Sequence, residues 1–342
     1  MTADSSPGVS VVIPTYRGRD ALRHSLPPLV ADPSVGEIIV IVDGLDDGSV
    51  DDLRRLSRLH SNVRWEYVPN GGEMAARDRG AELARGEVVL FLDQDVVAGP
   101  GLAGRHARLH AASPHRLVVG YMPTTAAGRP SFTTRLYARD YERRCSGYET
   151  DPESILTHLW GGNFSLRRSD CLAIRLRRPG FGQRERYHSD RELGLRCKQY
   201  GLVGVFDRSL RATHLHERDR AAFLQDSRSQ GSSLARLHQL HGKTLGPLRL
   251  AALAAGLPFP LRWVVAACRL RPVERVVEAG LLGVNRLAGA AGATKAELAT
   301  GKLLRRIGQQ RGALWVAQSR SETQSSSVSG NARCRLGGTM KF

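Results

Sequence analysis

The segment Val88-Val-Leu-Phe-Leu-Asp93-Gln94-Asp95 places two carboxylates directly after a short, wholly apolar run. A run of this length, bounded by polar residues, predicts a buried strand. Acids at the end of a buried strand are costly unless a cation compensates their charge. Hard divalent ions take oxygen ligands, and Mg²⁺ commonly joins one or two carboxylates to substrate phosphates. The segment therefore indicates a metal site at a strand end, with two solvated acids in a surface loop as the alternative.

The segments upstream alternate between apolar runs and helical patterns. The runs cover 9–14, 37–43 and 63–68, and the helical patterns cover 20–29, 50–59 and 73–85. Continuous apolar strands separated by helices are typical of a parallel sheet covered on both faces, which gives a doubly wound α/β domain. Ligands of such sheets bind outside the carboxyl ends of the strands. Two further strand ends carry polar groups there, at Pro14-Thr15-Tyr16 and at Asp43.

Downstream, the pattern predicts a helix over 102–112, a strand over 116–121 and a helix over 190–200. The Gly/Ser-rich stretch 227–233 and the region 242–247 indicate a boundary. We therefore expect a catalytic domain over 1–245, with a donor half at about 9–100 and an acceptor half at about 101–245. A basic helical extension over 246–318 and a disordered tail over 319–342 are expected to follow.

Charge is concentrated at the C-terminal end of the chain. The 342 residues include 50 Lys and Arg against 33 Asp and Glu, which leaves a net charge of +17. Such an excess predicts an anionic partner, which leaves nucleic acid, a membrane surface and an anionic substrate open, or else a solvated basic tail. The apolar run 250–261 is shorter than the roughly 20 residues that span a bilayer. It predicts either an interfacial amphipathic segment or a helical cap packed on the catalytic domain.

The cysteines and the first eight residues indicate the cellular compartment in which the protein is expected. The five cysteines are scattered and form no CxxC pair, so neither a disulfide framework nor a zinc site is indicated. The stretch 1–8 is polar and lacks the basic and apolar regions of a signal peptide. We expect a cytoplasmic protein, with peripheral contact to the inner membrane face through the basic extension.

Four motifs stand in order along the first hundred residues: Val11-Val-Ile-Pro14-Thr15-Tyr16, Asp43, Asn70-Gly71-Gly72 leading into Ala76-Arg77-Asp78-Arg79-Gly80, and Phe91-Leu92-Asp93-Gln94-Asp95. Together they closely resemble the family 2 glycosyltransferases of GT-A fold, and the resemblance covers about 9–233. It implies a mixed, mostly parallel sheet flanked by helices. It also implies an inverting hexosyltransferase-type enzyme (EC 2.4) that takes a sugar from a nucleotide donor.

The resemblance also assigns roles to single residues on the donor side. Pro14, Thr15 and Tyr16 are expected to line the base pocket, with Asp43 at the base or ribose and Arg77 near the nucleotide. Asp93 is expected near the ribose and the donor sugar, and Asp95 is expected to hold Mg²⁺ or Mn²⁺ against the diphosphate. A cation there stabilises charge where it develops in the transition state.

The segment 188–196 resembles the family's Glu-Asp-x-x-Leu stretch, with Asp190 at the position of the catalytic base. An inverting transfer needs a carboxylate that removes the proton of the acceptor hydroxyl. An ordinary helix N-cap is the alternative for Asp190. The chain departs from the family pattern at two positions, because Ser189 replaces the usual Glu and Asp78 the usual Asn. Residues 44–46 also separate Asp43 from Asp47, which leaves open which aspartate meets the base.

Two further segments resemble parts of the family's site. Trp160, Gly161, Gly162 and Asn163 match the acceptor side, where glycines permit close approach of a substrate, although a tight turn into a strand explains them equally well. His214 and His216 match a late histidine that completes the metal or diphosphate site in some members. We expect these two side chains to point opposite ways, so that at most one serves, and we favour His216. A surface histidine without a ligand is the alternative for each.

Other functions are weighed against this one. A sugar nucleotidyltransferase would need a loop rich in glycine and arginine after the first strand, which residues 14–18 match poorly. A nucleic-acid-binding protein would interleave basic and aromatic residues, but from 261 onward the aromatic residues are Trp263, Trp315 and Phe342. A protein that only binds nucleotide sugars would not need Asp190. The donor base is expected to be UDP, with dTDP or GDP as alternatives, and the acceptor is a sugar, lipid carrier, peptide or small molecule.

Overall fold

The computed structural model describes residues 8–125, 130–181, 187–216 and 219–334. The chain divides into two compact units, one of residues 1–184 with 189–218, and one of residues 185–188 with 219–342. The boundary between the two units follows residue 218, whereas the sequence predicts that the catalytic domain ends at 245. Helix α9 (Arg220–Leu240) accounts for this difference, because it packs along helix α14 (Thr294–Cys334) and so joins the C-terminal helices.

Among the described residues, eight strands of the N-terminal unit form one mixed sheet in the order β3-β2-β1-β4-β7-β6-β8-β5. The strands are β1 (Val9–Thr15), β2 (Val35–Asp43), β3 (Val63–Val68), β4 (Val88–Leu92), β5 (Val96–Ala98), β6 (Arg116–Tyr121), β7 (Asn163–Arg167) and β8 (Val203–His214). The first four strands pair in parallel, whereas β7 pairs antiparallel with both β4 and β6. The mixed, partly parallel α/β sheet expected from the sequence is confirmed.

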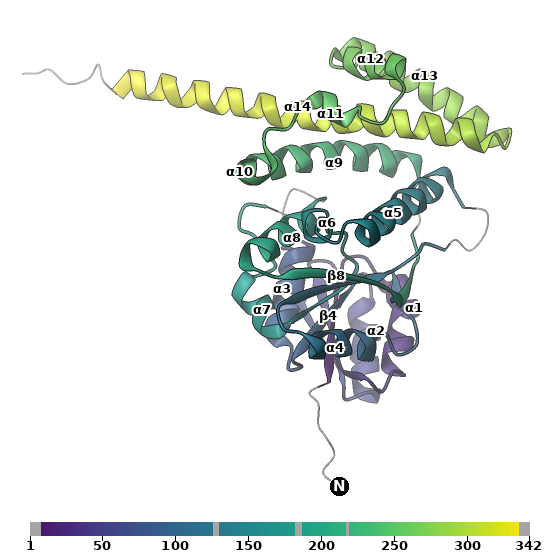
Figure 1. Ribbon diagram of the computed structural model, residues 1–342, viewed down its shortest axis with the longest axis vertical. Helices are drawn as coiled ribbons and strands as arrows, with labels where there is room; N and C mark the ends of the chain where they lie inside the picture. The colour runs from purple at the N-terminus through teal and green to yellow at the C-terminus, as the bar shows by residue number, and fades with distance from the viewer. Residues whose placement is uncertain (1–7, 126–129, 182–186, 217–218, 335–342) are drawn as a thin grey trace, which may run out of the picture. The chain divides into compact units, whose positions relative to one another are not determined.

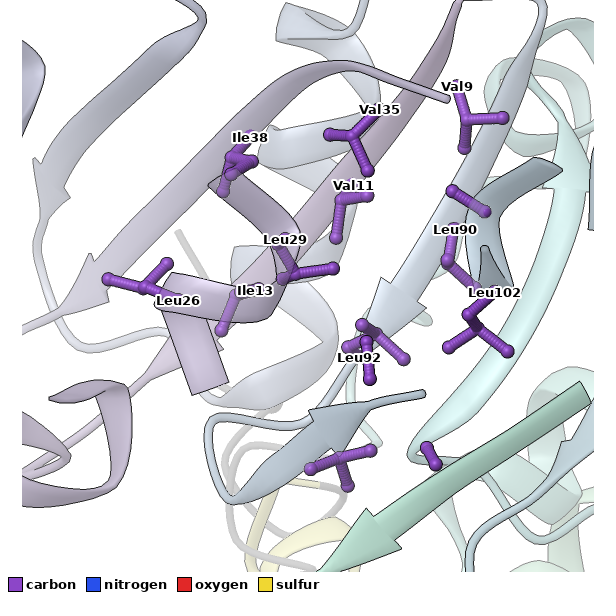
Figure 2. Close-up of a cluster of buried hydrophobic side chains, with 14 of the residues drawn as sticks. Val9, Val11, Ile13, Leu26, Leu29, Val35, Ile38, Leu90, Leu92 and Leu102 are labelled. Atoms are coloured by element: carbon purple, nitrogen blue, oxygen red, sulfur yellow. The ribbon is translucent and has the colours of Figure 1, made fainter. Parts of the chain in front are cut away.

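The parallel strands are buried on both faces, which explains their unbroken apolar runs. Side chains of alternate residues enter two separate cores, so Val11 and Ile13 join one and Val12 joins the other. Figure 2 shows the first core, where Val11 and Ile13 of β1 lie close to Leu29 of the covering helix. This two-residue period holds the carboxyl ends of β1, β2 and β4 in register at one edge.

Helices cover both faces of the sheet. The first core contains side chains from α1 (Arg19–Val30), α2 (Ser49–Leu59), α4 (Leu102–Ala112) and α5 (Phe132–Thr150). The second contains side chains from α3 (Glu73–Leu83), α6 (Ser154–Thr157), α7 (Arg168–Ile174) and α8 (Ser189–Tyr200). The ribbon in Figure 1 shows α4 and α3 on either side of β4. The helices therefore sandwich the sheet, and its strand ends are left for a site.

Three local differences from the sequence-based expectations concern segments with weak patterns. Helix α1 begins at Arg19 and continues to Val30, one residue beyond the predicted pattern at each end, and contains Pro27 and Pro28 in its last turn; their fixed φ is helical, although each removes an amide donor. The long helix α5 was not predicted, because its sequence is polar and lacks a clear apolar period. Strand β8 extends to His214 rather than ending near Phe206.

The C-terminal unit contains α9, α10 (Gly242–Leu245), α11 (Leu250–Leu253), α12 (Phe259–Ala267), α13 (Arg271–Ala290) and α14. Helices α11, α12 and α13 all pack against α14. Helix α14 continues to Cys334, so residues 319–334 are helical rather than the coil that was expected, and residues 335–342 of the predicted tail lie outside the described part. Within the described residues, no helix is long and apolar enough to cross a membrane.

A histidine pair lies buried between α4 and β7. His106 Nδ1 and His110 Nε2 each lie 2.8 Å from Ser165 Oγ, and His106 Nε2 lies 3.1 Å from Asn163 Oδ1. Since an amide oxygen only accepts, His106 Nε2–H donates to Asn163, and Ser165 O–H donates to His106 Nδ1. Ser165 Oγ then accepts from His110 Nε2–H. Both imidazoles are therefore neutral in the folded chain.

Acid is expected to weaken the fold through this pair. Burial lowers the pKa of His106 to about 3 and that of His110 to about 4, both below the usual 6.5. The unfolded chain takes up these protons first. The stabilisation is therefore fully present above pH 6.5, falls as the pH drops below 6.5, and is fully lost once the pH has passed the folded pKa values. Each neutral histidine adds a slope of about 1.4 kcal/mol per pH unit in that window.

Thermal unfolding between pH 7.5 and 4.5 measures this slope. We expect His106→Asn to be less stable at pH 7.5 but to lose less stability on acidification than the unchanged chain. His24→Asn, on the exposed side of α1, is the control and should leave the slope unaltered. Equal slopes in His106→Asn and the unchanged chain would show that His106 titrates normally.

Candidate active site

Gln94, between the two aspartates, joins the loop after β1 to the end of β4. Its Oε1 accepts hydrogen bonds from Thr15 Oγ1 at 2.8 Å and from the Tyr16 amide at 2.9 Å. A Cβ at Gly18 would lie 2.2 Å from the same oxygen, so glycine is required for this close approach. The sequence analysis gave Gln94 no role, although its place inside the acidic motif was the available signal. The Pro14–Tyr16 segment and the acidic motif are thereby brought together.

Asp43 is buried at the end of β2 and organises the next loop. Its two carboxylate oxygens accept hydrogen bonds from the amides of Gly71, at 2.7 Å, and Gly72, at 3.0 Å. These bonds fix the loop that leads into α3. The alternatives Asp46 and Asp47 instead accept bonds from backbone amides at the start of α2. The nucleotide contact predicted for Asp43 stays a prediction.

Arg77 on α3 is the central cation of the site, and its side chain is 0% exposed. Its Nη2 lies 2.6 Å from Asp93 Oδ1, and its Nη1 lies 2.8 Å from Asp190 Oδ1. Nη2 also pairs with Glu73 Oε1 at 2.5 Å, and the guanidinium lies over the ring of Phe164. The sequence placed Arg77 near the nucleotide. In the structure it joins the carboxylate of the acidic motif to the candidate base, and its position near the nucleotide stays a prediction.

The carboxylates around Arg77 influence one another's protonation. Burial raises the pKa of Asp93, and repulsion from Asp95 and Asp190 acts in the same direction, although Arg77 opposes it. Burial alone would lower the pKa of Arg77, but Glu73, Asp93 and Asp190 raise it on balance, so the guanidinium stays charged. One buried cation therefore compensates several acids, which makes the cluster dependent on Arg77.

Asp190 lies in the first turn of α8, and its side chain is 27% exposed. Its Oδ2 accepts a hydrogen bond from the Gly161 amide at 3.1 Å, in addition to the bond from Arg77 to Oδ1. Both of these donors belong to segments outside α8. An N-cap carboxylate would instead accept hydrogen bonds from the amides of its own helix. Two donors fix the carboxylate, and one side of it stays open to solvent.

The glycine pair after Trp160 packs directly on the site's own carboxylates. A Cβ at Gly161 would lie 2.5 Å from Asp190 Oδ1, and one at Gly162 would lie 2.8 Å from Asp93 Oδ2. Gly162 also has a positive φ of 105°. The glycines were expected to permit close approach of a substrate, which stays a prediction. In the structure they permit close approach of the Asp190 and Asp93 carboxylates.

Substituting Gly161 is expected to disturb this arrangement. In Gly161→Ala the new methyl group must push the Asp190 carboxylate away from Arg77, and we expect turnover of a nucleotide-sugar donor to fall about 10²-fold. Nucleotide affinity should be retained, because Asp95 and the loop after β1 are not displaced. Gly147→Ala on α5, where a Cβ meets no atom within 4 Å, is the matched control and should keep full turnover. Equal turnover in both variants would contradict the role of the contact.

The second aspartate of the motif, Asp95, faces His214 at the end of β8. His214 Nε2 lies 3.3 Å from Asp95 Oδ1, and Tyr137 Oη lies 3.0 Å from His214 Nδ1. Tyr137 also accepts a hydrogen bond from Trp160 Nε1 at 3.2 Å and stacks on His216 with ring centroids 4.0 Å apart. Tyr137, which belongs to no motif, therefore connects the predicted acceptor side with the predicted metal side.

The two histidine rings lie on the same side of the chain, with centroids 5.2 Å apart. The expectation that they point opposite ways is wrong, because residues two apart along a strand point to the same face, and only adjacent residues alternate. His214 lies within reach of the Asp95 carboxylate, with 3.3 Å between Nε2 and Oδ1. The assignment of His216 as the metal ligand stays a prediction, with His214 as its rival.

The donor set fits a cation that is held partly by the substrate. Burial would raise the pKa of Asp95, but the hydrogen bond and charge of His214 hold it below its usual range, so a carboxylate is present at neutral pH. Among the described residues, no group of three or more His, Cys, Asp or Glu side chains is arranged for a metal ion. Asp95 and one histidine therefore provide two ligands, and phosphate oxygens and water would complete the shell.

Not every predicted residue lies at this cluster. Asn163 is 1% exposed, and its amide bonds His106 and the carbonyl of Leu210, so it belongs to the interior. The acceptor contact predicted for it stays a prediction. Tyr16, by contrast, is 41% exposed, which leaves its ring available at the strand end. The arrangement as a whole places a fixed, partly exposed carboxylate beside a second carboxylate at the carboxyl end of the parallel strands.

Comparison with known proteins finds similarity to glycosyltransferases over the first half of the chain. The model of the family described as "Glycosyl transferase family 2" matches residues 10–174. An uncharacterized glycosyltransferase, YibD of Escherichia coli (strain K12), is 36% identical over 93 residues, which cover 27% of each chain. A validoxylamine A glucosyltransferase of Streptomyces hygroscopicus subsp. limoneus is 36% identical over 120 residues, 33% of this chain and 26% of the relative. The matched segments thus span about a quarter of these relatives.

The fold has a solved counterpart. Mannosyltransferase PcManGT from Pyrobaculum calidifontis, determined in complex with GDP-Man and Mn²⁺, superposes with a TM-score of 0.57 at 16% identity. The likeness covers 90% of this chain and 87% of that one, and it shows a shared fold. It agrees with the GT-A architecture expected from the sequence. Residues 10–174 are thus similar to the family 2 glycosyl transferases, and the chain shares its fold with a solved mannosyltransferase.

Proposed function

We propose that the chain is an inverting glycosyltransferase that moves a sugar from a nucleoside-diphosphate donor to an acceptor hydroxyl. The observation that carries the proposal is the pairing of Asp93 and Asp190 through Arg77 at the strand ends of a domain similar to the family 2 glycosyl transferases. One carboxylate follows the donor-side strand, and the other comes from a separate helix. A single buried guanidinium holds them at a fixed separation, as a reaction between two bound substrates requires.

Asp190 is the proposed general base. The Gly161 amide and Arg77 orient its carboxylate, and its exposed side can accept the proton of an acceptor hydroxyl. As the acceptor oxygen forms its bond to the anomeric carbon, the bond from that carbon to the diphosphate breaks. The diphosphate leaves with the electron pair, and the hydroxyl proton passes to Asp190. Attack from the face opposite the leaving group inverts the configuration.

On the donor side, we assign Pro14, Thr15, Tyr16 and Asp43 to the nucleotide and Asp93 to the ribose and sugar. Asp95 and one of His214 and His216 would hold Mn²⁺ or Mg²⁺, which when bound neutralises charge on the leaving diphosphate. PcManGT was solved with GDP-Man and Mn²⁺, and we propose the same class of donor and ion here. UDP is the first candidate base, and dTDP and GDP follow.

Donor turnover with water as the stand-in acceptor tests the proposal. The full chain is incubated with Mn²⁺ and each of several UDP-, dTDP- and GDP-sugars. Release of nucleoside diphosphate is followed together with the anomeric configuration of the freed sugar by NMR. We expect one class of α-linked donor to yield the β-sugar first. Retained configuration would contradict the proposed mechanism, and formation of sugar 1-phosphate and nucleoside triphosphate when pyrophosphate is added would favour a nucleotidyltransferase.

A further inference from the structure

Helices α12 and α13 of the C-terminal unit have an apolar inner face that is already used. Val265 and Cys268 are buried together with Leu303 and Ile307 of α14, and Val277 of α13 packs against the same cluster. Figure 1 shows α12 and α13 next to each other within this unit. Their inner faces therefore account for the attachment of both helices to α14.

The same two helices also carry large apolar side chains on their solvent side. Phe259 and Trp263 of α12 are 69% and 64% exposed, Leu270 between the helices is 65% exposed, and Val276 and Leu287 of α13 are 74% and 72% exposed. Val276 and Leu287 lie three turns apart on one side of α13, with Gly280 and Gly283 between them, and Val284 is 50% exposed nearby. We call these exposed residues, from 259 to 287, the outer face. Scattered exposed apolar residues are common, but an aligned set marks an interaction surface.

The charged residues next to the outer face are cationic. Exposed arginines stand at its sides: Arg262, Arg269, Arg271, Arg275 and Arg286. The two acids of this segment are held by other helices instead, since Glu274 pairs with Arg311 of α14 and Glu278 pairs with Arg228 of α9. The outer face therefore combines apolar and aromatic side chains with uncompensated positive charge.

We propose that the outer face of α12 and α13 docks on an anionic lipid bilayer. Phe259 and Trp263 would enter the boundary between headgroups and acyl chains, where aromatic rings are favoured, and the arginines would contact anionic headgroups. The binding is peripheral, because no described helix is long and apolar enough to cross a membrane. The proposal stands independently of the nucleotide site.

Charge complementarity selects a bilayer over other occupants. A second copy of the chain would bring the same arginines together across a twofold axis, which repels. A nucleic acid would satisfy the arginines and stack on Trp263, but it offers no apolar surface to the exposed Val276, Val284 and Leu287. An anionic bilayer satisfies both the charge and the apolar side chains.

Vesicle co-sedimentation of the full chain tests the proposal. We expect it to pellet with phosphatidylcholine vesicles that contain about 30 mol% phosphatidylglycerol, and about tenfold less with phosphatidylcholine alone or at high salt. The double substitution Phe259→Ser with Trp263→Ser is expected to lower the partition coefficient at least about tenfold. Arg271→Gln with Arg275→Gln should weaken binding to anionic vesicles and leave the weak binding to neutral vesicles unchanged.

Leu59→Ser is the matched control, because Leu59 is 78% exposed but lies on α2 of the other unit. It should sediment as the unchanged chain does, and far-UV circular dichroism confirms that each variant is folded. Failure of the unchanged chain to pellet, or equal pelleting of the serine variant, would overturn the proposal. A dimer that the serine substitutions dissociate, without vesicle binding, would show that a second copy covers the outer face. The melting temperature of the serine variant is also measured with nucleotide. A rise that persists there shows that the nucleotide site works, even if the outer face does not bind vesicles or is covered by a second copy.

Discussion

Asp190→Asn is expected to lower donor turnover by about 10²- to 10⁴-fold, the range that a general base contributes. An amide still accepts the hydrogen bond from the Gly161 amide, but it cannot take a proton from an acceptor hydroxyl. Nucleotide affinity should change little, because Asp190 is assigned to the acceptor side. The loss should therefore appear in kcat, measured as release of nucleoside diphosphate from the preferred donor.

Asp151→Asn, at the exposed end of α5, is the control for this variant and should retain full turnover. A thermal shift with nucleotide confirms that Asp190→Asn is folded and binds its donor. If the variant kept turnover within a few-fold of the unchanged chain, Asp190 would not be the base, and the pairing with Arg77 would be structural.

Arg77→Leu is expected to destabilise the N-terminal unit by about 3–5 kcal/mol, as removal of one partner from a buried ion pair does. Glu73, Asp93 and Asp190 would then face one another without their shared cation. For a unit of this size the loss corresponds to a fall of about 10 °C in melting temperature. Turnover should also be abolished, because the two site carboxylates are no longer held together.

Arg79→Leu, two residues further along the same helix and on its exposed side, is the matched control. Its side chain is 40% exposed and pairs with Glu66 and Glu82 at the surface, so we expect a loss below about 1 kcal/mol. Differential scanning calorimetry of the two variants measures the contrast. Similar melting temperatures for both would mean that the acids around Arg77 release their charge by protonation instead.

The sequence predicted the sheet and the strand ends because both depend on local pattern. The strand at 63–68 was located to the residue, and the acidic motif at Asp93 and Asp95 follows a buried strand as expected. Parallel strands buried on both faces produce long apolar runs that are readable from one sequence. The GT-A architecture was implied by the resemblance of four motifs, in order along the chain, to family 2 glycosyltransferases.

The contacts inside the site were less predictable, because they join residues that are far apart in the sequence. Arg77 and Asp190 are 113 positions apart, and Tyr137 and His214 are 77 apart. Neither distance leaves a periodic trace in the sequence. The glycines at 161 and 162 were recognised as permitting close approach, but the groups that approach them became visible only in three dimensions. The strand-alternation argument for His214 and His216 failed because side chains two residues apart on a strand share one face.

The central claim is a metal-dependent donor site at Asp95, and nucleotide-induced stabilisation tests it most directly. The melting temperature of the full chain is measured with UDP, dTDP or GDP, each with and without Mn²⁺, beside Asp95→Ala. A ligand that binds only the folded state at about 100 times its Kd stabilises it by about 2.7 kcal/mol. We predict that one nucleotide raises the melting temperature only with Mn²⁺, and that Asp95→Ala removes the rise. No rise with any nucleotide, or an equal rise in Asp95→Ala, would contradict the account.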